Sequence, residues 1–306
     1  MSTTEDKITA WFAHQSKLSP SDFPIGIGDD MAQIKFGSES VFVTTDMLLD
    51  GVHFDLKKAT LKQVGYKAMA VSLSDCAAMA TVPVAAVVSV AMPKGFGGRE
   101  LKQLHAGIVQ AGDKYNCALV GGDITCWKGK SPFAINVAML SKQGDNEPVK
   151  RSGAKVGDCI CVTGYLGGSV HGRHLKFEPR IEEALKIAKM VTVNSMMDIS
   201  DGLSSDLKRI CEQSGVGAIV DAGCIPVSKQ AGKTPNPLNS ALNDGEDFEL
   251  LFTLSHSNCK KLLSDWNELI PITQIGTVTD TMKMKIKMPD GRLEDLKTGG
   301  YEHLKD

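Results

Sequence analysis

The stretch Met197-Asp198-Ile199-Ser200-Asp201-Gly202-Leu203 carries two carboxylates close together in the sequence. The apolar segment Val191 to Met197 predicts a strand, and the apolar spacing from Gly202 onward predicts a helix. Asp198 and Asp201 therefore stand where a strand leads into a helix, near enough to hold one cation or ligand between them. Oxygen-only groups of this kind suit Mg²⁺, which is usually shared with phosphate oxygens. Taken alone, however, the stretch fits a helix N-cap better than a metal site.

The same arrangement recurs upstream, where aspartates stand beside glycine, threonine or serine at the ends of apolar segments. These are Asp29-Asp30, Asp46, Asp75 and Asp123. Each one alone is explained as a cap or turn former. Because they alternate with apolar strands, the set favours one convergent acidic pocket. So many carboxylates would repel one another without cations, so the pocket predicts two or more Mg²⁺ ions, a phosphate-rich substrate and phosphoryl transfer.

Composition is that of an ordinary globular protein. Of the 306 residues, 42% are hydrophobic and 23% are charged, and the length favours two domains. The formal net charge of -2 gives no reason to expect a nucleic-acid partner. A negatively charged substrate must therefore be bound by local donors or by metal ions.

Cysteine usage and apolar runs predict a cytoplasmic protein with no membrane partner. The eight cysteines include no C-x-x-C pair, which favours free thiols over a zinc site or disulfides. No signal peptide is evident at the N-terminus. The most apolar run, Ala77 to Met92, is short and contains Pro83, so it predicts a buried strand rather than a membrane span.

Alternating strand and helix patterns predict the α/β (α+β) class, with two mixed sheet-and-helix domains. The polar, turn-rich segment Gly144 to Pro148 is the best boundary, which gives domains 1–148 and 149–306. In the first domain we expect strands at 32–36, 41–46, 82–92, 117–120 and 133–140, and helices at 61–79 and 97–115. In the second we expect strands at 159–163, 217–221, 248–254, 272–278 and 283–288, and helices at 179–190, from 202 onward and at 258–270.

The familiar nucleotide-binding signatures are missing from the sequence. Gly129-Lys130-Ser131 and Gly232-Lys233-Thr234 both lack the upstream glycine of a phosphate-binding loop. No G-x-G-x-x-G occurs, and no serine, cysteine or histidine is framed as an activated nucleophile. If this chain uses ATP, it must do so with a different fold.

Eight stretches are spread over nearly the whole chain: Gly26-Ile27-Gly28-Asp29-Asp30, Thr44-Thr45-Asp46, Gly51-Val52-His53-Phe54, Leu73-Ser74-Asp75, Val120-Gly121-Gly122-Asp123, Arg151-Ser152-Gly153-Ala154-Lys155, Asp198-Ile199-Ser200-Asp201-Gly202-Leu203 and Gly245-Glu246-Asp247-Phe248-Glu249-Leu250. They occur in the order typical of thiamine-monophosphate kinases. The chain resembles that family, which belongs to the superfamily of aminoimidazole ribonucleotide synthetase and selenophosphate synthetase. One stretch would be a weak indication, but the ordered set is highly specific.

The resemblance implies the aminoimidazole ribonucleotide synthetase fold, paired as a homodimer through the N-terminal domain. It implies ATP-dependent phosphorylation of thiamine monophosphate to the diphosphate by direct in-line transfer, with several Mg²⁺ ions. Catalysis would act through metal held by Asp30, Asp46, Asp75, Asp123, Asp198 and Asp201, with Thr44 and Thr45 as further ligands. ATP would contact Gly122, Asp123, Arg151 and Ser200, and thiamine monophosphate would contact His53, Glu246 and Tyr301.

Simpler interpretations of four residues stay open. His53 also fits a hydrogen-bonded loop histidine, Arg151 a salt-bridge residue at the domain boundary, Tyr301 a packing anchor and Glu246 a surface turn residue. Two other functions also stay open. One is another ATP-using synthetase of the superfamily, although selenophosphate chemistry would want a cysteine near the N-terminus and the first here is Cys76. The other is a non-catalytic nucleotide- or metal-binding relative.

Three departures from the family pattern bear on the site. Asp244-Gly245-Glu246-Asp247 replaces Gly-Gly-Glu-Asp, which removes a glycine and adds a charge. His105 stands where some relatives have a tyrosine near adenine, so the nucleobase contact is undetermined. The segment Gly164 to Pro179 is shorter than usual, which affects how ATP would be covered.

Overall fold

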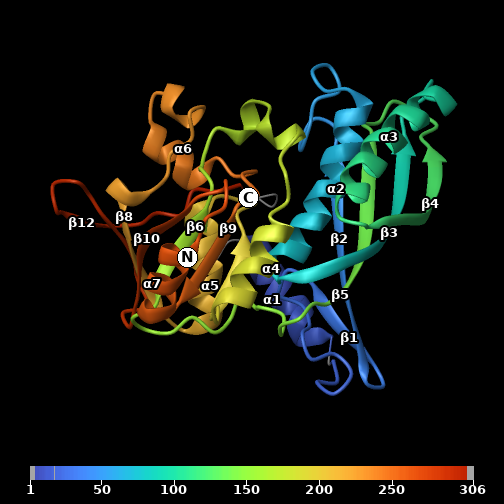
Figure 1. The fold of residues 1–306 in the computed structure, drawn as a ribbon. Coiled ribbons are helices and arrows are strands. Elements are labelled where there is room, and N and C mark those ends of the chain that lie inside the picture. The colour runs from blue at the N-terminus through green and yellow to red at the C-terminus, as the bar shows by residue number, and fades with distance from the viewer. Residues whose placement is uncertain (1–3, 17, 302–306) are drawn as a thin grey trace.

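Two mixed β-sheets with associated helices make up the protein, as the computed structural model shows for residues 4–16 and 18–301 (Figure 1). The predicted α/β (α+β) class is confirmed. The first sheet is built from strands that end by residue 143, and the second from strands that begin at residue 159. The domain limits 1–148 and 149–306 stay a prediction.

The first sheet has five strands in the order β1-β2-β5-β3-β4. Neighbouring strands are antiparallel except β3 and β4, which run parallel and are connected through helix α3. A parallel pair needs such a crossover, whereas β1 and β2 are joined by a tight turn. The bounds are β1 Ala32–Phe36, β2 Glu39–Leu49, β3 Thr81–Met92, β4 Ala118–Cys126, β5 Ala134–Gln143, α1 Thr4–Gln15, α2 Leu61–Ala78 and α3 Gly98–Lys114.

The second sheet has seven strands in the order β12-β11-β8-β10-β6-β9-β7. Its central strands β6 and β9 are buried along their whole length, which explains their continuous apolar runs. The strand bounds are β6 Cys159–Thr163, β7 Ser195–Asp198, β8 Gly217–Asp221, β9 Leu250–Leu254, β10 Ile272–Thr279, β11 Met284–Lys287 and β12 Leu293–Asp295. The helices are α4 Ile181–Met190, α5 Leu203–Ser214, α6 Pro237–Asn243 and α7 His256–Asp265, with 3₁₀ helices at Ser169–His171, Arg173–Leu175, Ala222–Cys224 and Ala231–Lys233.

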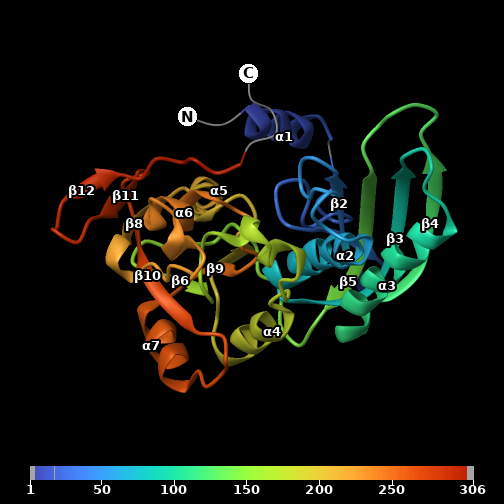
Figure 2. The same ribbon diagram turned by 90° about the horizontal axis from the view of Figure 1, so that it is seen from above.

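Helix α2 brings the two sheets together. Buried residues lie on every side of it, which is typical of a helix inside the core rather than on the surface. It contacts β2 and β5 of the first sheet, and β7 and α4 of the second half. Figure 2 shows α2 in the middle of the molecule, between the strands of both sheets. A capping box between Thr60 and Gln63 fixes where the helix begins. Polar side chains on α2 can therefore meet polar side chains from both sheets.

Most predicted elements are confirmed, and the differences have physical reasons. Gly121, Gly122 and Asp123 lie inside β4 rather than at its end, because parallel pairing with β3 continues to Cys126. Helix α7 ends at Asp265, earlier than predicted. The short helix α6 and the exposed strand β12 were not predicted, because neither has a long apolar repeat. Within the described part of the chain, no helix combines the length and apolarity that a membrane crossing needs.

Candidate functional site

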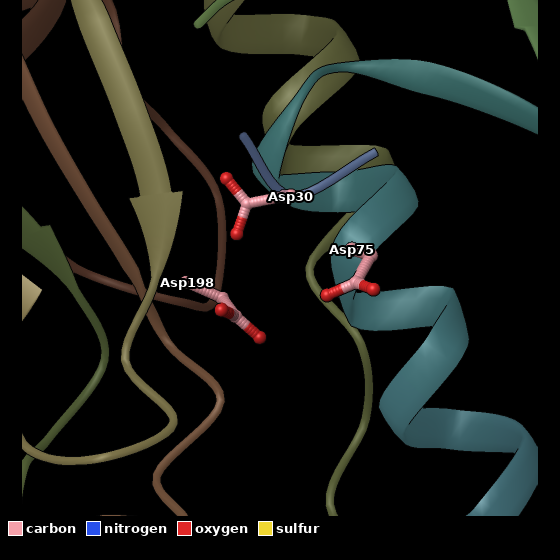
Figure 3. Close-up of side chains that lie close together, drawn as sticks. All are labelled: Asp30, Asp75 and Asp198. Carbon is pink, nitrogen blue, oxygen red and sulfur yellow. The ribbon is translucent and has the colours of Figure 1, made fainter. Parts of the chain in front are cut away.

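Three aspartates from distant parts of the sequence meet where α2 passes between the sheets. Asp30 comes from the loop before β1, Asp75 from α2 and Asp198 from the end of β7. One carboxylate oxygen of each lies within 4.8 Å of the others. In Figure 3 the three carboxylates point into one common space. The sequence prediction that these residues converge agrees with this geometry.

Burial and neighbouring charges raise the pKa values of Asp46, Asp75 and Asp198. Burial, together with the neighbouring carboxylates Asp46, Asp198 and Asp30, raises the pKa of Asp75 well above its ordinary value. Burial and then Asp30 raise the pKa of Asp198 to about 7. Burial also raises the pKa of Asp46 to about 6, against a hydrogen bond from Ser72. Like charges held this close in a buried place favour either protons or a cation among them.

Hydroxyl groups orient the acidic side chains. Thr44 Oγ1 donates to the Asp75 carboxylate, and Ser72 Oγ donates to Asp46 Oδ2 at 2.6 Å. Ser74 Oγ donates to Asp198 Oδ2 at 2.5 Å, which joins α2 to the second sheet. Ser72 and Ser74 were not predicted as site residues. Their signal in the sequence is only that two serines interrupt the apolar run that precedes Asp75.

Arg151 is bound to the acidic cluster. Its Nε donates to Asp30 Oδ2 at 3.0 Å and its Nη2 donates to Asp30 Oδ1 at 2.7 Å, a bidentate pair. Its Nη1 also donates to the carbonyl oxygen of Gly28, and its backbone N donates to Asp29. The boundary salt-bridge interpretation of Arg151 therefore describes its contacts, and its predicted role in ATP binding stays a prediction.

Asp201 belongs to a second ionic group beside the cluster. Arg209 lies between Asp201 and Asp206, with N–O distances of 2.6 Å to each carboxylate. Asp206 accepts from the backbone N–H groups of Asp201 and Gly202, both at 3.1 Å. The N-cap of α5 is Gly202, so the N-cap interpretation of Asp198 and Asp201 is wrong. Arg209 was missed because nothing in its local sequence distinguishes it from an exposed helix residue.

A large pocket opens beside the cluster, with a volume of about 1350 Å³. Asp46 lies both in its wall and next to Asp75, so the pocket reaches the acidic group. The segment 170–176, with His171 and Arg173, forms another wall. Part of the Gly164–Pro179 segment thus lines the pocket, and its shortening relative to the family stays a prediction. The predicted site residues that line the pocket are Thr45, Asp46, His53, Ser200, Asp201, Glu246 and Tyr301.

The three residues predicted to bind the acceptor differ in their contacts. Glu246 is not a surface turn residue, since its carboxylate accepts from the buried Lys67. His53 Nδ1 accepts from the backbone N–H of Leu49 at 3.0 Å, as the loop-histidine interpretation expects. Tyr301 is 48% exposed, and its backbone N–H donates to the carbonyl oxygen of Asp201. A packing anchor would be more deeply buried.

Some predicted site residues do not reach this cluster within one chain. Strand alternation turns Thr45 to the opposite face of β2 from Thr44 and Asp46, where its hydroxyl bonds Asn136. Gly122 and Asp123 lie on the edge strand β4, exposed to solvent. A side chain at Gly122 would collide with the carbonyl oxygen of Val88, so strand pairing already explains that glycine. His105 is an exposed residue of α3.

The donor set of the cluster fits a hard divalent cation. Asp30, Asp75 and Asp198 offer only oxygen, and among the described residues they are the group whose ligand atoms lie within coordinating reach of one another. The raised pKa values of Asp75 and Asp198 agree with negative charge that the protein environment alone does not satisfy. The sequence frames no serine, cysteine or histidine as an activated nucleophile, which favours electrostatic over covalent catalysis as the hypothesis for this site.

Comparison with known proteins identifies similar chains over the full length. The family models for "AIR synthase related protein, N-terminal domain" and "AIR synthase related protein, C-terminal domain" match residues 28–142 and 127–288. The thiamine-monophosphate kinase of Rhodopirellula baltica is 37% identical, covering 98% of this chain and 97% of its own length. That of Escherichia coli K12 is 31% identical, covering 99% of both. The structure of AaThiL complexed with AMPPCP and TMP matches with a TM-score of 0.82 and 28% identity, over 99% of both chains.

The raised pKa of Asp198 predicts that the protein becomes less stable as the pH rises toward 7. Because the folded protein holds this proton up to about pH 7 and the unfolded chain releases it near 3.8, the folded state carries more protons in between. The free energy of unfolding therefore falls as pH rises through that window. Asp198→Asn removes this loss and keeps an acceptor for Ser74. In the presence of chelator, we expect the variant to melt at least about 3 °C above the wild type at pH 7.5, with a smaller difference at pH 5.

The measurement is thermal denaturation of both proteins at the two pH values. Asp145→Asn is the matched control, because the Asp145 side chain is 83% exposed and should leave the melting temperature unchanged at both. A difference between Asp198→Asn and the wild type that does not vary with pH would contradict the assignment.

Proposed function

The chain belongs to the thiamine-monophosphate kinase family, and we propose from this how its acidic cluster and pocket carry out the reaction. The enzyme phosphorylates thiamine monophosphate to thiamine diphosphate with ATP (EC 2.7.4.16). Its full-length relatives carry this activity in their names, which favours it over another synthetase of the superfamily. The single observation that carries the mechanistic proposal is the convergence of Asp30, Asp75 and Asp198 next to a pocket large enough for two substrates.

We infer that the carboxylates hold Mg²⁺. Asp30, Asp46, Asp75 and Asp198 would provide most of the ligands, with Thr44, Asp123 and Asp201 as further predicted ligands. The predicted set also includes Thr45, although its hydroxyl bonds Asn136 on the opposite face of β2. When held by these residues, Mg²⁺ would supply positive charge to neutralise the phosphate oxygens and stabilise the transferring group. In support of this assignment, carboxylates with raised pKa values bind a cation in place of the protons that they otherwise keep.

The phosphoryl group passes directly between the two substrates. A phosphate oxygen of thiamine monophosphate forms a bond to the γ-phosphorus as the bond to the β–γ bridging oxygen breaks, and ADP leaves. The protein's contribution is to align the two phosphates and exclude water. Ser200 and Arg151 would contact ATP, while His53, Glu246 and Tyr301 would bind the acceptor at the pocket walls. Direct transfer between the two substrates needs no protein nucleophile, in agreement with the residues that line the pocket.

A second copy of the chain would bring Asp123 to the site. Across the first sheet, Asp46 of β2 pairs with Val137 of β5, Val137 pairs with Val88 of β3, and Val88 pairs with Gly122 of β4, the residue before Asp123. Three strand spacings, about 14 Å, thus separate Asp123 from Asp46 in one chain. Side chains exposed on this sheet include Met47, Val84, Val87, Val120, Ile124 and Leu140, an apolar area of the kind that a homodimer buries.

The function is tested by incubating the purified protein with ATP, thiamine monophosphate and Mg²⁺ and separating the products. We expect thiamine diphosphate and ADP in equal amounts, and loss of turnover when chelator exceeds Mg²⁺, because the carboxylates cannot hold polyphosphate alone. Full turnover in excess chelator would rule out the metal assignment. Absence of thiamine diphosphate under all metal conditions would refute the proposed function.

Mixing two inactive variants tests the role of Asp123. In a mixed dimer of Asp75→Asn and Asp123→Asn, one site would carry both substitutions and the other neither. We expect each variant alone to lose turnover by orders of magnitude. After the two are unfolded and refolded together, turnover should recover to about a quarter of the wild-type rate, since half the dimers are mixed and each has one intact site. No recovery in a verified mixed dimer would show that Asp123 does not act across the interface.

A further inference from the structure

Lys67 is a buried cation with no assigned role. It lies on α2, and its side chain is 0% exposed. Its Nζ donates to Glu246 Oε2 and to the carbonyl oxygen of His53. Because a buried charge is costly unless it is paired and hydrogen-bonded, these two acceptors account for its presence in the core.

The two partners of Lys67 come from opposite halves of the chain. His53 lies in the loop after β2, and Glu246 lies in the segment between α6 and β9. Both residues line the pocket, and so does Lys67. A single ammonium group therefore ties together two pocket walls that the sequence separates by almost two hundred residues.

The segment around Glu246 is held in an unusual conformation. Glu246 has a φ of 58°, which is uncommon for a residue other than glycine. Its backbone N–H donates to the carbonyl oxygen of Ser200 at 2.7 Å, within the turn that follows Asp198. Strained backbone of this kind persists only where surrounding contacts fix it. Lys67 supplies one of these contacts by binding the Glu246 carboxylate.

Helix α2 also connects Lys67 to the acidic cluster. Asp75 follows Lys67 by eight residues, which is about 12 Å along a helix axis. One rigid helix thus carries both Asp75, at the acidic cluster, and Lys67, which holds the two pocket walls. The separation between these two ends is set by helix geometry rather than by loops.

We propose that Lys67 is a positioning residue for the acceptor substrate. By holding the Glu246 carboxylate and the His53 loop at a fixed distance from Asp75, it places the ring end of a phosphomonoester so that its phosphate reaches the transfer site. This inference rests on the proposed function. Burial lowers the pKa of Lys67 and the Glu246 carboxylate opposes that shift, in agreement with a charge-paired contact.

Lys67→Met tests the proposal, because methionine keeps most of the apolar stem and removes the ammonium group. We expect the KM for thiamine monophosphate to rise about tenfold or more and kcat to fall, because a misplaced acceptor reacts poorly. The KM for ATP should stay within about twofold of the wild type. Lys62→Met is the matched control, since Lys62 is an exposed lysine of the same helix and should change neither constant.

A second measurement separates positioning from a purely structural role. If Lys67 acts through Glu246, the double variant Lys67→Met/Glu246→Gln should lose no more acceptor affinity than the worse single variant. Equal rises in both KM values, additive losses or an unchanged KM for thiamine monophosphate would overturn the proposal. If Lys67→Met does not fold, the same constants are measured on Lys67→Gln, which keeps a donor, and the same outcomes decide. Failure of the wild type to turn over thiamine monophosphate would instead refute the proposed function.

Discussion

Repulsion among buried carboxylates is the constraint on which the rest of this structure depends. Asp30, Asp75 and Asp198 lie close enough for their charges to interact strongly, and Asp30 and Asp198 are buried while Asp75 is partly buried. Such an arrangement destabilises the fold unless protons or cations are present. Each of the three comes from a different element, so the fold has to assemble the repelling group during folding. That cost is consistent with a site kept for binding a cation rather than for stability.

The surrounding contacts reduce this cost without removing it. Ser74 and Thr44 donate to carboxylate oxygens, and the bidentate Arg151 pair satisfies both oxygens of Asp30. Most of these donors lie on or against α2, the helix between the two sheets. The same helix carries Lys67 at the other end of the pocket. The two ends of the substrate site are therefore positioned by one continuous backbone.

The sequence predicted the strands and long helices well, because β3 and α3 have a clear apolar periodicity and β6 and α2 are rich in apolar residues. Of the aspartates that the sequence grouped into one pocket, Asp30, Asp75 and Asp198 meet in the structure, whereas Asp201 pairs with Arg209. The sequence could not predict Ser72, Arg209 or the Lys67–Glu246 pair, because each depends on a partner brought near only by the tertiary fold. It also grouped Asp123 with the cluster, although strand order separates the two within one chain.

Calorimetric titration of Mg²⁺ tests the central claim most directly, namely that the clustered aspartates form a cation site. The titration is performed on the protein with a non-hydrolysable ATP analogue, and it is repeated on Asp75→Asn. We expect the wild type to bind Mg²⁺ beyond what the nucleotide alone binds, and the variant to lose that additional binding. An unchanged stoichiometry and affinity in Asp75→Asn would contradict the account.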